Sequence, residues 1–209
     1  FADQLLVQRA PRMAGVIARQ TRKLARFLDD LLEGSRIEQA FDMPVCMRAS
    51  NVDEVLAHAC DVVGCVLSER GQTLSVKISP EEEVRSTMLW CDPERLAQAL
   101  GGALLNASQF SDDGAAISLA VAVDGVFLEL LVSDHGIGVE QAELSLMFQP
   151  FRQFAMHPGR AASGAGLGLA IARSVSRAHR GTVSADSAGR GQGLRLKLVL
   201  PVVLDATFA

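Results

Sequence analysis

The chain has 209 residues, 49% of them apolar, which is enough for a folded domain with an appendage and excludes wholesale disorder. Its 20 basic and 24 acidic side chains give a formal charge of −4, which argues against a nucleic-acid-binding protein because such proteins usually carry a basic face. No run approaches the roughly 20 apolar residues of a membrane-spanning helix, so we expect membrane association only if a longer parent protein is anchored.

The first residue and the cysteines bear on the origin of the chain. It begins at Phe1, without a methionine or a signal-like segment, so we expect it to be part of a longer protein. None of the four cysteines has C-x-x-C spacing and no histidine cluster accompanies them, which favours buried reduced thiols over a zinc site. Reduced thiols are typical of the cytoplasm, and we expect a cytoplasmic location.

Residues 12–38 are expected to form one long helix. Apolar residues such as Met13, Ile17, Leu24 and Leu31 are four or seven positions apart, while charged residues occupy the other faces. Such a narrow apolar stripe needs a partner helix. We interpret the segment as part of a helical bundle, either intermolecular or truncated; a surface helix packed on its own domain is the alternative.

From residue 52 onward the pattern is mixed α/β. Asp92-Pro93 is a helix N-cap followed by a favoured first residue, and Asp124-Gly125 between two apolar runs is a strong hairpin signal. Residues 41–51 are expected to be a connector, 79–83 a turn and 149–166 a loop. The expected helices cover residues 52–69, 93–110, 139–145 and 167–180, and the expected strands cover 73–78, 87–91, 116–123, 126–133, 182–187 and 194–200.

Two glycine-rich segments carry candidate chemistry. In the first, a buried strand leads into Asp134, Gly136 and Gly138; an aspartate at a strand end can accept a hydrogen bond from an exocyclic amine, and glycines let backbone approach a ligand. In the second, Gly164, Gly166 and Gly168 open an apolar helix, whose first N–H groups would form an anion site. Taken alone, the first is also compatible with a plain turn and the second with a flexible hinge.

A third candidate is Asn106, a polar residue on a helix of small and apolar neighbours. Its amide oxygen is a hard ligand suited to magnesium. The alternative is an asparagine that is satisfied by hydrogen bonds within the protein.

The order of these segments resembles the Bergerat ATP-binding fold, which histidine kinases, type II topoisomerases, mismatch-repair ATPases and one heat-shock chaperone family share. The resemblance is closest to sensor histidine kinases: residues 146–151, LMFQPF, are similar to their phenylalanine box, residues 164–171, GAGLGLAI, to their second glycine box, and residues 31–37, LLEGSRI, to the end of their second dimerisation helix. The match extends from about residue 12 to residue 201.

This resemblance implies an α+β fold: a two-layer α/β sandwich with a mixed sheet and about three helices, preceded by a long helix of a dimerisation bundle. Residues 1–40 would be the dimerisation region and residues 41–209 the catalytic and ATP-binding domain. The expected cofactors are ATP and Mg²⁺. The expected partners are a response regulator receiver domain and a second copy of the protein, joined through the dimerisation helices.

The resemblance also assigns roles to residues. Asp134 would contact the adenine amine, Asn106 would hold Mg²⁺, and Arg152 would reach the γ-phosphate. Residues 152–165 would form a mobile lid anchored by the packing of Phe148 and Phe151. The implied ATP-binding residues are Asn106, Gln109, Asp134, Gly136, Gly138, Phe151, Arg152, Gly164, Ala165, Gly166, Leu167 and Gly168.

The chain departs from the family first in its histidines. None of His58, His135, His157 and His179 lies in a sequence like that of the phosphoacceptor histidine, so no catalytic acceptor is assigned within the chain. We expect the helix that carries the acceptor to be removed or truncated; a genuine loss in the parent protein is the alternative.

Gly102 and Gln109 are the second departure. Histidine kinases usually have an asparagine four residues before the one matched by Asn106, and a lysine or arginine where Gln109 stands. We therefore carry two hypotheses: a histidine kinase catalytic domain, and a degenerate nucleotide-binding regulatory or scaffolding module without autokinase activity. A hydrolysing ATPase would need a glutamate base in this helix, where Gly102 stands, and ranks below both.

Overall fold

A computed structural model describes residues 44–152 and 166–202 of the chain. The long helix predicted for residues 12–38, the boundary predicted at residue 40 and most of the predicted lid lie outside these residues. Within the described ranges, no helix combines the length and the hydropathy that a bilayer crossing requires.

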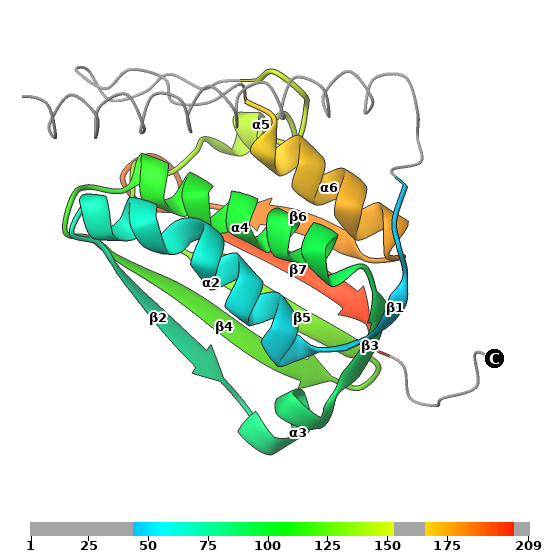
Figure 1. The fold of residues 1–209 in the computed structure, drawn as a ribbon. Coiled ribbons are helices and arrows are strands. Elements are labelled where there is room, and N and C mark those ends of the chain that lie inside the picture. The colour runs from blue at the N-terminus through cyan, green and yellow to red at the C-terminus, as the bar shows by residue number, and fades with distance from the viewer. Residues whose placement is uncertain (1–43, 153–165, 203–209) are drawn as a thin grey trace, which may run out of the picture.

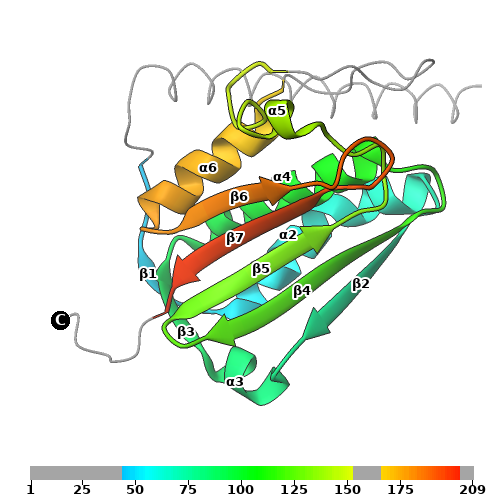
Figure 2. The same ribbon diagram turned by 180° about the vertical axis from the view of Figure 1, so that it is seen from behind.

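The described residues form a five-stranded sheet with helices on one face (Figures 1 and 2). The strand order is β2-β4-β5-β7-β6; β2 runs parallel to β4 and the other neighbours are antiparallel. The strands are β2 (Thr73–Ile78), β4 (Ala116–Asp124), β5 (Phe127–Ser133), β6 (Thr182–Asp186) and β7 (Arg195–Pro201). The three long helices are α2 (Val52–Glu69), α4 (Pro93–Phe110) and α6 (Gly168–Ala178). The predicted two-layer α+β architecture with a mixed sheet is confirmed.

The helix starts and the hairpin are set by local chemistry. The Asp92 side chain accepts a hydrogen bond from the backbone N–H of Arg95 at 3.0 Å, with Pro93 in the first turn, as the sequence predicts for α4. Asn51 caps α2 in the same way, accepting from the N–H of Glu54 at 2.8 Å. Gly125 has φ +60 in the β4–β5 turn, which suits glycine.

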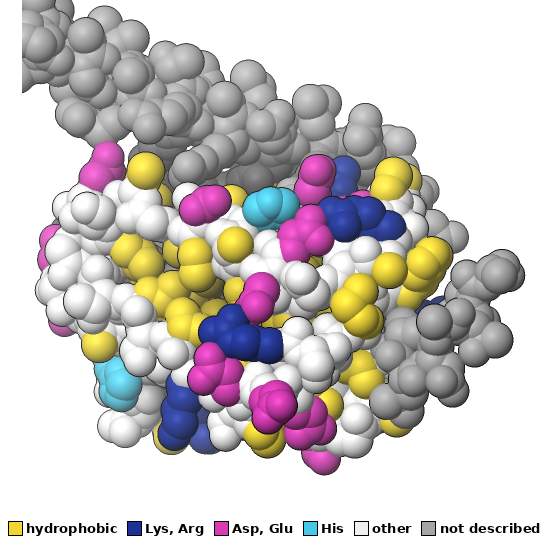
Figure 3. Space-filling view, turned by 60° about the horizontal axis from the view of Figure 1, so that its bottom comes forward, with side chains coloured by type: hydrophobic (Ala, Val, Ile, Leu, Met, Phe, Trp, Pro, Cys, Tyr) yellow, Lys and Arg dark blue, Asp and Glu magenta, His cyan; other side chains and the backbone are white. Residues whose placement is uncertain are grey.

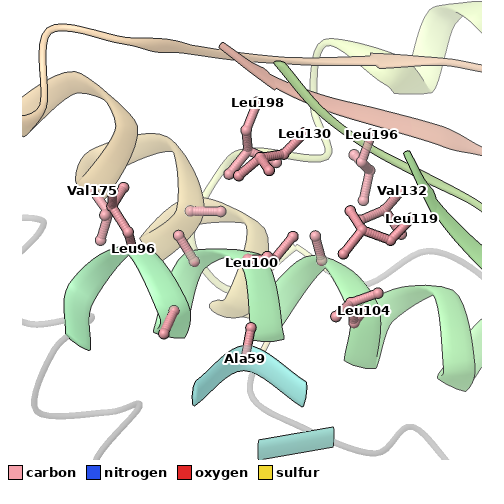
Figure 4. Packing of buried hydrophobic residues seen from close by; sticks show 14 of the residues in the cluster. Ala59, Leu96, Leu100, Leu104, Leu119, Leu130, Val132, Val175, Leu196 and Leu198 are labelled. Atoms are coloured by element: carbon pink, nitrogen blue, oxygen red, sulfur yellow. The ribbon is translucent and has the colours of Figure 1, made fainter. Parts of the chain in front are cut away.

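The core lies between the sheet and the helices. Alternate residues of β4, β5 and β7 face inward, and Leu119, Leu130 and Leu198 among them are at most 1% exposed. Figure 4 shows these side chains packed over α4, whose Leu100 and Leu104 have no exposed surface. Full burial of each such side chain contributes about 1.5–3 kcal/mol. α4 packs against both α2 and α6, which makes it the central helix of the domain.

Two elements differ from the sequence-based expectation. Residues 41–51 were expected to be a connector, but β1 (Arg48–Asn51) pairs antiparallel with β3 (Met88–Cys91). Only one residue of β1 is buried, so its sequence lacks the apolar alternation that would indicate a strand. Residues 79–83 were expected to be a turn, but α3 (Glu81–Ser86) begins within them. This helix is too short for a periodic signal.

The helix predicted for residues 139–145 is present in a shorter form, as α5 (Gln141–Leu144).

All four cysteines are free; Cys46 and Cys65 are exposed and Cys60 is half-buried, so the expectation that the thiols are buried is confirmed only for Cys91. On the face drawn in Figure 3, apolar side chains are interspersed with side chains of both charges.

Candidate nucleotide-binding site

Asp134 follows the last residue of β5 and is 6% exposed. Its Oδ1 accepts hydrogen bonds from two backbone N–H groups, of Gly136 at 2.8 Å and of Leu194 at 3.2 Å. Burial raises the pKa of this carboxyl group, and the two N–H donors and the charge of His135 partly oppose the rise. Hydrogen bonds to Oδ1 thus hold the carboxylate in place, and no hydrogen bond within the described residues involves Oδ2.

The two glycines after Asp134 are required by close backbone contacts. A Cβ atom on Gly136 would lie 2.2 Å from the carbonyl oxygen of Phe110, the last residue of α4. A Cβ atom on Gly138, which has φ +62, would lie 2.1 Å from the carbonyl oxygen of Gly189. Both positions therefore exclude a side chain, and the loop after β5 is held against the C-terminus of α4 and the loop between β6 and β7.

The second glycine segment ends at the start of α6. Gly166 has φ +73, and a Cβ there would lie 2.7 Å from the carbonyl oxygen of Arg152. Leu167 is the N-cap of α6 and makes no side-chain capping hydrogen bond. The first turn of α6 therefore offers backbone donors and the positive end of the helix dipole, which is the arrangement of an anion site. Gly164 and Ala165 lie outside the described residues.

Helix α4 connects the two glycine segments. A Cβ atom on Gly102 would lie 3.3 Å from the carbonyl oxygen of Gly168, so α4 touches the start of α6 at this point. Eight residues further along, the carbonyl oxygen of Phe110 accepts a hydrogen bond from the N–H of Ile137 at 3.2 Å in the loop after Asp134. At 1.5 Å per residue these two contacts are about 12 Å apart along α4. The structure thus brings together the anion site and the buried carboxylate, which are separate in the sequence.

Asn106 lies midway between these contacts. Its Nδ2 is buried and has no hydrogen-bond partner among the described residues. The alternative of an asparagine satisfied within the protein is therefore not supported, since such a side chain would have its amide atoms paired. Gln109, the other predicted α4 residue, is partly buried one turn later.

Comparison with known proteins agrees with this geometry. The family model described as histidine kinase-, DNA gyrase B- and HSP90-like ATPase matches residues 91–204. The chain belongs to this family.

Among its relatives in this ATPase family, the chain is 32% identical to sensor histidine kinase RcsC of Salmonella typhimurium over 86% of its own length and 18% of that protein. It is 28% identical to sensor histidine kinase CpxA of Escherichia coli over 89% of its length and 39% of that protein. The chain thus spans less than half the length of these relatives. The part of these relatives that the chain resembles is their ATP-binding domain.

Solved structures show the same fold. The mycobacterial sensor histidine kinase MprB superposes with a TM-score of 0.63 at 25% identity, covering 75% of this chain and 98% of that one. Full-length ShkA in complex with AMPPNP superposes with a TM-score of 0.73 at 24% identity, covering 94% of this chain and 40% of that one. The predicted resemblance to the ATP-binding domain of sensor histidine kinases is therefore confirmed.

The two phenylalanines of the ATPase domain's phenylalanine box differ from each other. Phe148 is buried at 8% exposure, as expected of a packing anchor, but Phe151 is 45% exposed. Phe151 also has φ +59, an unusual conformation for a bulky residue. Phe151 is therefore not buried as Phe148 is, and because most of the lid lies outside the described residues, its packing against the lid stays a prediction. Arg152 is exposed, and its Nε donates to Oε1 of Gln149 at 3.5 Å.

Two buried polar residues to which the sequence assigned no role hold parts of the ATPase domain together. His179, the C-cap of α6, accepts a hydrogen bond at Nε2 from the backbone N–H of Asp92 at 2.9 Å, and its Nδ1 contacts the carbonyl oxygen of Val175 at 2.8 Å. Ser187 follows β6 and bonds the loop between β6 and β7. The alternating glycines of residues 189–193 were the available signal for this loop, because they resemble the spacing of the two predicted glycine segments.

Proposed function

We propose that the chain binds Mg²⁺-ATP between the loop after β5, the C-terminal half of α4 and the start of α6. We further propose that the whole protein transfers the γ-phosphate to a histidine outside the described residues and then to the receiver domain of a response regulator. The observation that supports this most is the fixed carboxylate of Asp134 and the anion site at Gly168, joined by about 12 Å of α4 with Asn106 between them.

The base would be recognised by Asp134. With Oδ1 occupied by two N–H donors, Oδ2 is the oxygen left to accept a hydrogen bond from an exocyclic amine. An ionised carboxylate has no proton to donate, so it selects an amine donor and disfavours a carbonyl in the same place. This chemistry fits adenine and disfavours guanine.

The phosphates would lie at the first turn of α6, where Gly166 and Gly168 have no side chain and the side chain of Leu167 is buried in the core. The donor set also fits a magnesium ion, because the amide oxygen of Asn106 is a hard ligand and the Nδ2 of the same amide has no hydrogen-bond partner within the described part of the protein. When bound, Mg²⁺ neutralises charge on the phosphates. Asn106 would hold the ion and Arg152 would approach the γ-phosphate.

The whole protein would work as a homodimer through its dimerisation helices, on the cytoplasmic side of the membrane if it is anchored. The similarity to RcsC and CpxA, both named sensor histidine kinases, supports this part of the proposal. The AMPPNP bound to ShkA supports the nucleotide part.

Asp134→Asn tests the binding of the base. The amide keeps an oxygen for the two N–H donors but turns an NH₂ group toward the adenine amine, so we expect ATP affinity to fall roughly 10- to 100-fold. Isothermal titration calorimetry of the whole chain with Mg²⁺-ATP measures the loss. Asp186→Asn is the matched control, because Asp186 is exposed on β6 and pairs only with Arg195 among the described residues. Equal ATP affinity in Asp134→Asn and wild type would exclude the assignment.

A second function is favoured by one observation. A Cβ atom on Gly102 would lie 3.3 Å from the carbonyl oxygen of Gly168, so this turn of α4 offers bare backbone, and no polar side chain, beside Asn106. A nucleotide-binding module that regulates or scaffolds without autokinase activity would tolerate this arrangement. Incubation of the full-length parent with radiolabelled ATP and magnesium separates the two functions, since a labelled histidine excludes the second.

An ATP-hydrolysing role has less support. The only acidic residue of α4 is Glu94, which is 12 residues, or about 18 Å of helix, from Asn106. It is too far away to act as a general base for a water at the phosphates.

A further inference from the structure

The loop between β6 and β7 is fastened by one buried hydroxyl group. Ser187, 8% exposed, donates from Oγ to the carbonyl oxygen of Gly193 at 2.7 Å and accepts from the backbone N–H of Val139 at 3.1 Å. The N–H of Gly189 also approaches this Oγ, at 3.3 Å. A single side chain therefore joins the end of β6, the start of β7 and the glycine loop that follows Asp134.

The segment that Ser187 holds is the one that orients Asp134. The carbonyl of Gly193 belongs to the same peptide group as the N–H of Leu194, which donates to Asp134 Oδ1 at 3.2 Å. The N–H of Gly193 donates to the carbonyl oxygen of Gly136 at 3.1 Å. A Cβ on Gly193, which has φ +69, would lie 2.0 Å from the carbonyl oxygen of Asp134, so this backbone contact leaves no space for a side chain at position 193.

The bond from Leu194 determines which oxygen of Asp134 faces a ligand. With two N–H donors on Oδ1, the carboxylate cannot rotate without losing a buried hydrogen bond. If the Gly193–Leu194 peptide moves away, only the Gly136 donor remains, and that donor is two residues from Asp134 in the same loop. The orientation of Oδ2 then becomes loose.

We propose that Ser187 is a positioning residue for nucleobase recognition: by holding the Gly193–Leu194 peptide, it directs Oδ2 of Asp134 toward the exocyclic amine of the base. This inference rests on the proposed ATP site and extends it to a residue that does not touch the nucleotide. The glycines at positions 138 and 193 make the arrangement possible because they let the two loops meet backbone to backbone.

A positioning role differs from a purely structural role in its pH dependence. Binding of the amine requires the ionised carboxylate, and the N–H of Leu194 is one of the groups that lower the pKa of Asp134 against the effect of burial. From β5, β7, the end of α4 and the surrounding loops, the charged side chain that acts on this carboxylate is His135, which also lowers its pKa. Loss of the Leu194 bond therefore moves the acidic limb of nucleotide binding to higher pH.

The experiment measures ATP and GTP affinity of the whole chain by calorimetry from about pH 4.5 to 8, a range that spans the carboxyl titration. We expect Ser187→Ala to bind ATP roughly tenfold more weakly, to discriminate less against GTP and to lose binding at a higher pH than wild type. Ser187→Thr keeps the hydroxyl group, and we expect it to restore the ATP affinity, the discrimination against GTP and the pH at which binding is lost. Ser176→Ala is the matched control, because Ser176 is also buried but its hydroxyl has no hydrogen-bond partner among the described residues.

The outcomes separate this inference from the proposed function. If Asp134→Asn weakens ATP binding while Ser187→Ala keeps wild-type affinity, base selectivity and pH midpoint, the positioning role is wrong and the ATP site stands. If Asp134→Asn leaves ATP binding unchanged, the site itself is wrong. Circular dichroism checks that each variant is folded; if Ser187→Ala is not, Ser187→Cys, of similar shape and with a weak donor, carries the same test.

Discussion

His179 is a buried imidazole whose neutral form is built into the domain. It is 4% exposed; Nδ1–H donates to the carbonyl oxygen of Val175 at 2.8 Å, and Nε2 accepts from the N–H of Asp92 at 2.9 Å. A proton on Nε2 would abolish the second bond. Burial lowers the pKa of His179 from its usual 6.5, more than the Val175 bond and the Asp92 charge raise it. We therefore expect the imidazole to make stability depend on pH.

The sign follows from proton linkage. Between pH 6.5 and the lower folded-state pKa, the unfolded chain binds a proton at His179 and the folded domain does not. The contribution of His179 to the free energy of unfolding is thus largest above pH 6.5 and falls as the pH drops through this window, by at most about 1.4 kcal/mol per pH unit. The raised pKa of Asp134 has the opposite effect on the unfolding free energy at more acidic pH. The His179 variant must therefore keep Asp134, so that this contribution cancels in its difference from wild type.

His179→Leu is the perturbation. At about pH 7.5 it leaves the buried N–H of Asp92 without its partner, and we expect a loss of about 1–3 kcal/mol in unfolding free energy. Because leucine does not titrate, the difference from wild type should narrow as the pH falls from about 7.5 to 5. Urea denaturation followed by circular dichroism at several pH values measures this difference, with His58→Leu on the exposed face of α2 as the control. A difference that stays constant over this pH range would refute the buried neutral imidazole.

Further predictions concern the glycines and the thiols. Gly138→Ala places a Cβ 2.1 Å from the carbonyl oxygen of Gly189 at φ +62, and we expect it to lower the unfolding free energy by more than about 2 kcal/mol in urea denaturation. Gly64→Ala, in an open position on α2, should instead stabilise by about 0.5–1 kcal/mol, and equal effects of the two changes would contradict the packing argument. Burial raises the pKa of Cys91 to about 11, so iodoacetamide at about pH 8 should label exposed Cys65 in the native protein and Cys91 only after unfolding, as mass spectrometry of the peptides would show. Native labelling of Cys91 at the rate of Cys65 would show that its strand opens.

Much of the fold follows from local sequence. The alternation in β4 and β5, the hairpin signal at Gly125 and the N-cap at Asp92 each predict an element that the structure confirms. These signals are local because a strand's period, a turn's φ and a cap's hydrogen bond all depend on residues within a few positions of one another. The order of the motifs then indicates the ATPase family.

The short elements could not be predicted in this way. β1 is recognisable as a strand only through its pairing with β3, some 40 residues later in the chain, as in the register of Arg48 with Cys91. α3 has one buried residue, Val84, and its ion pairs are made by Arg85 with Glu81 and with the distant Asp53. Contacts of this kind are invisible to a periodicity of two or 3.6 residues.

Local patterns were thus enough to predict the main strands and long helices, the glycine segments, and Asp134 and Asn106 as candidate ligand residues. How these residues are oriented came from tertiary packing alone. The carboxylate of Asp134 is held by Leu194, 60 residues away, Gly102 faces Gly168, and Phe151 is exposed. A carboxylate's orientation depends on which donors surround it, and those donors come close only when separate strands and loops pack together.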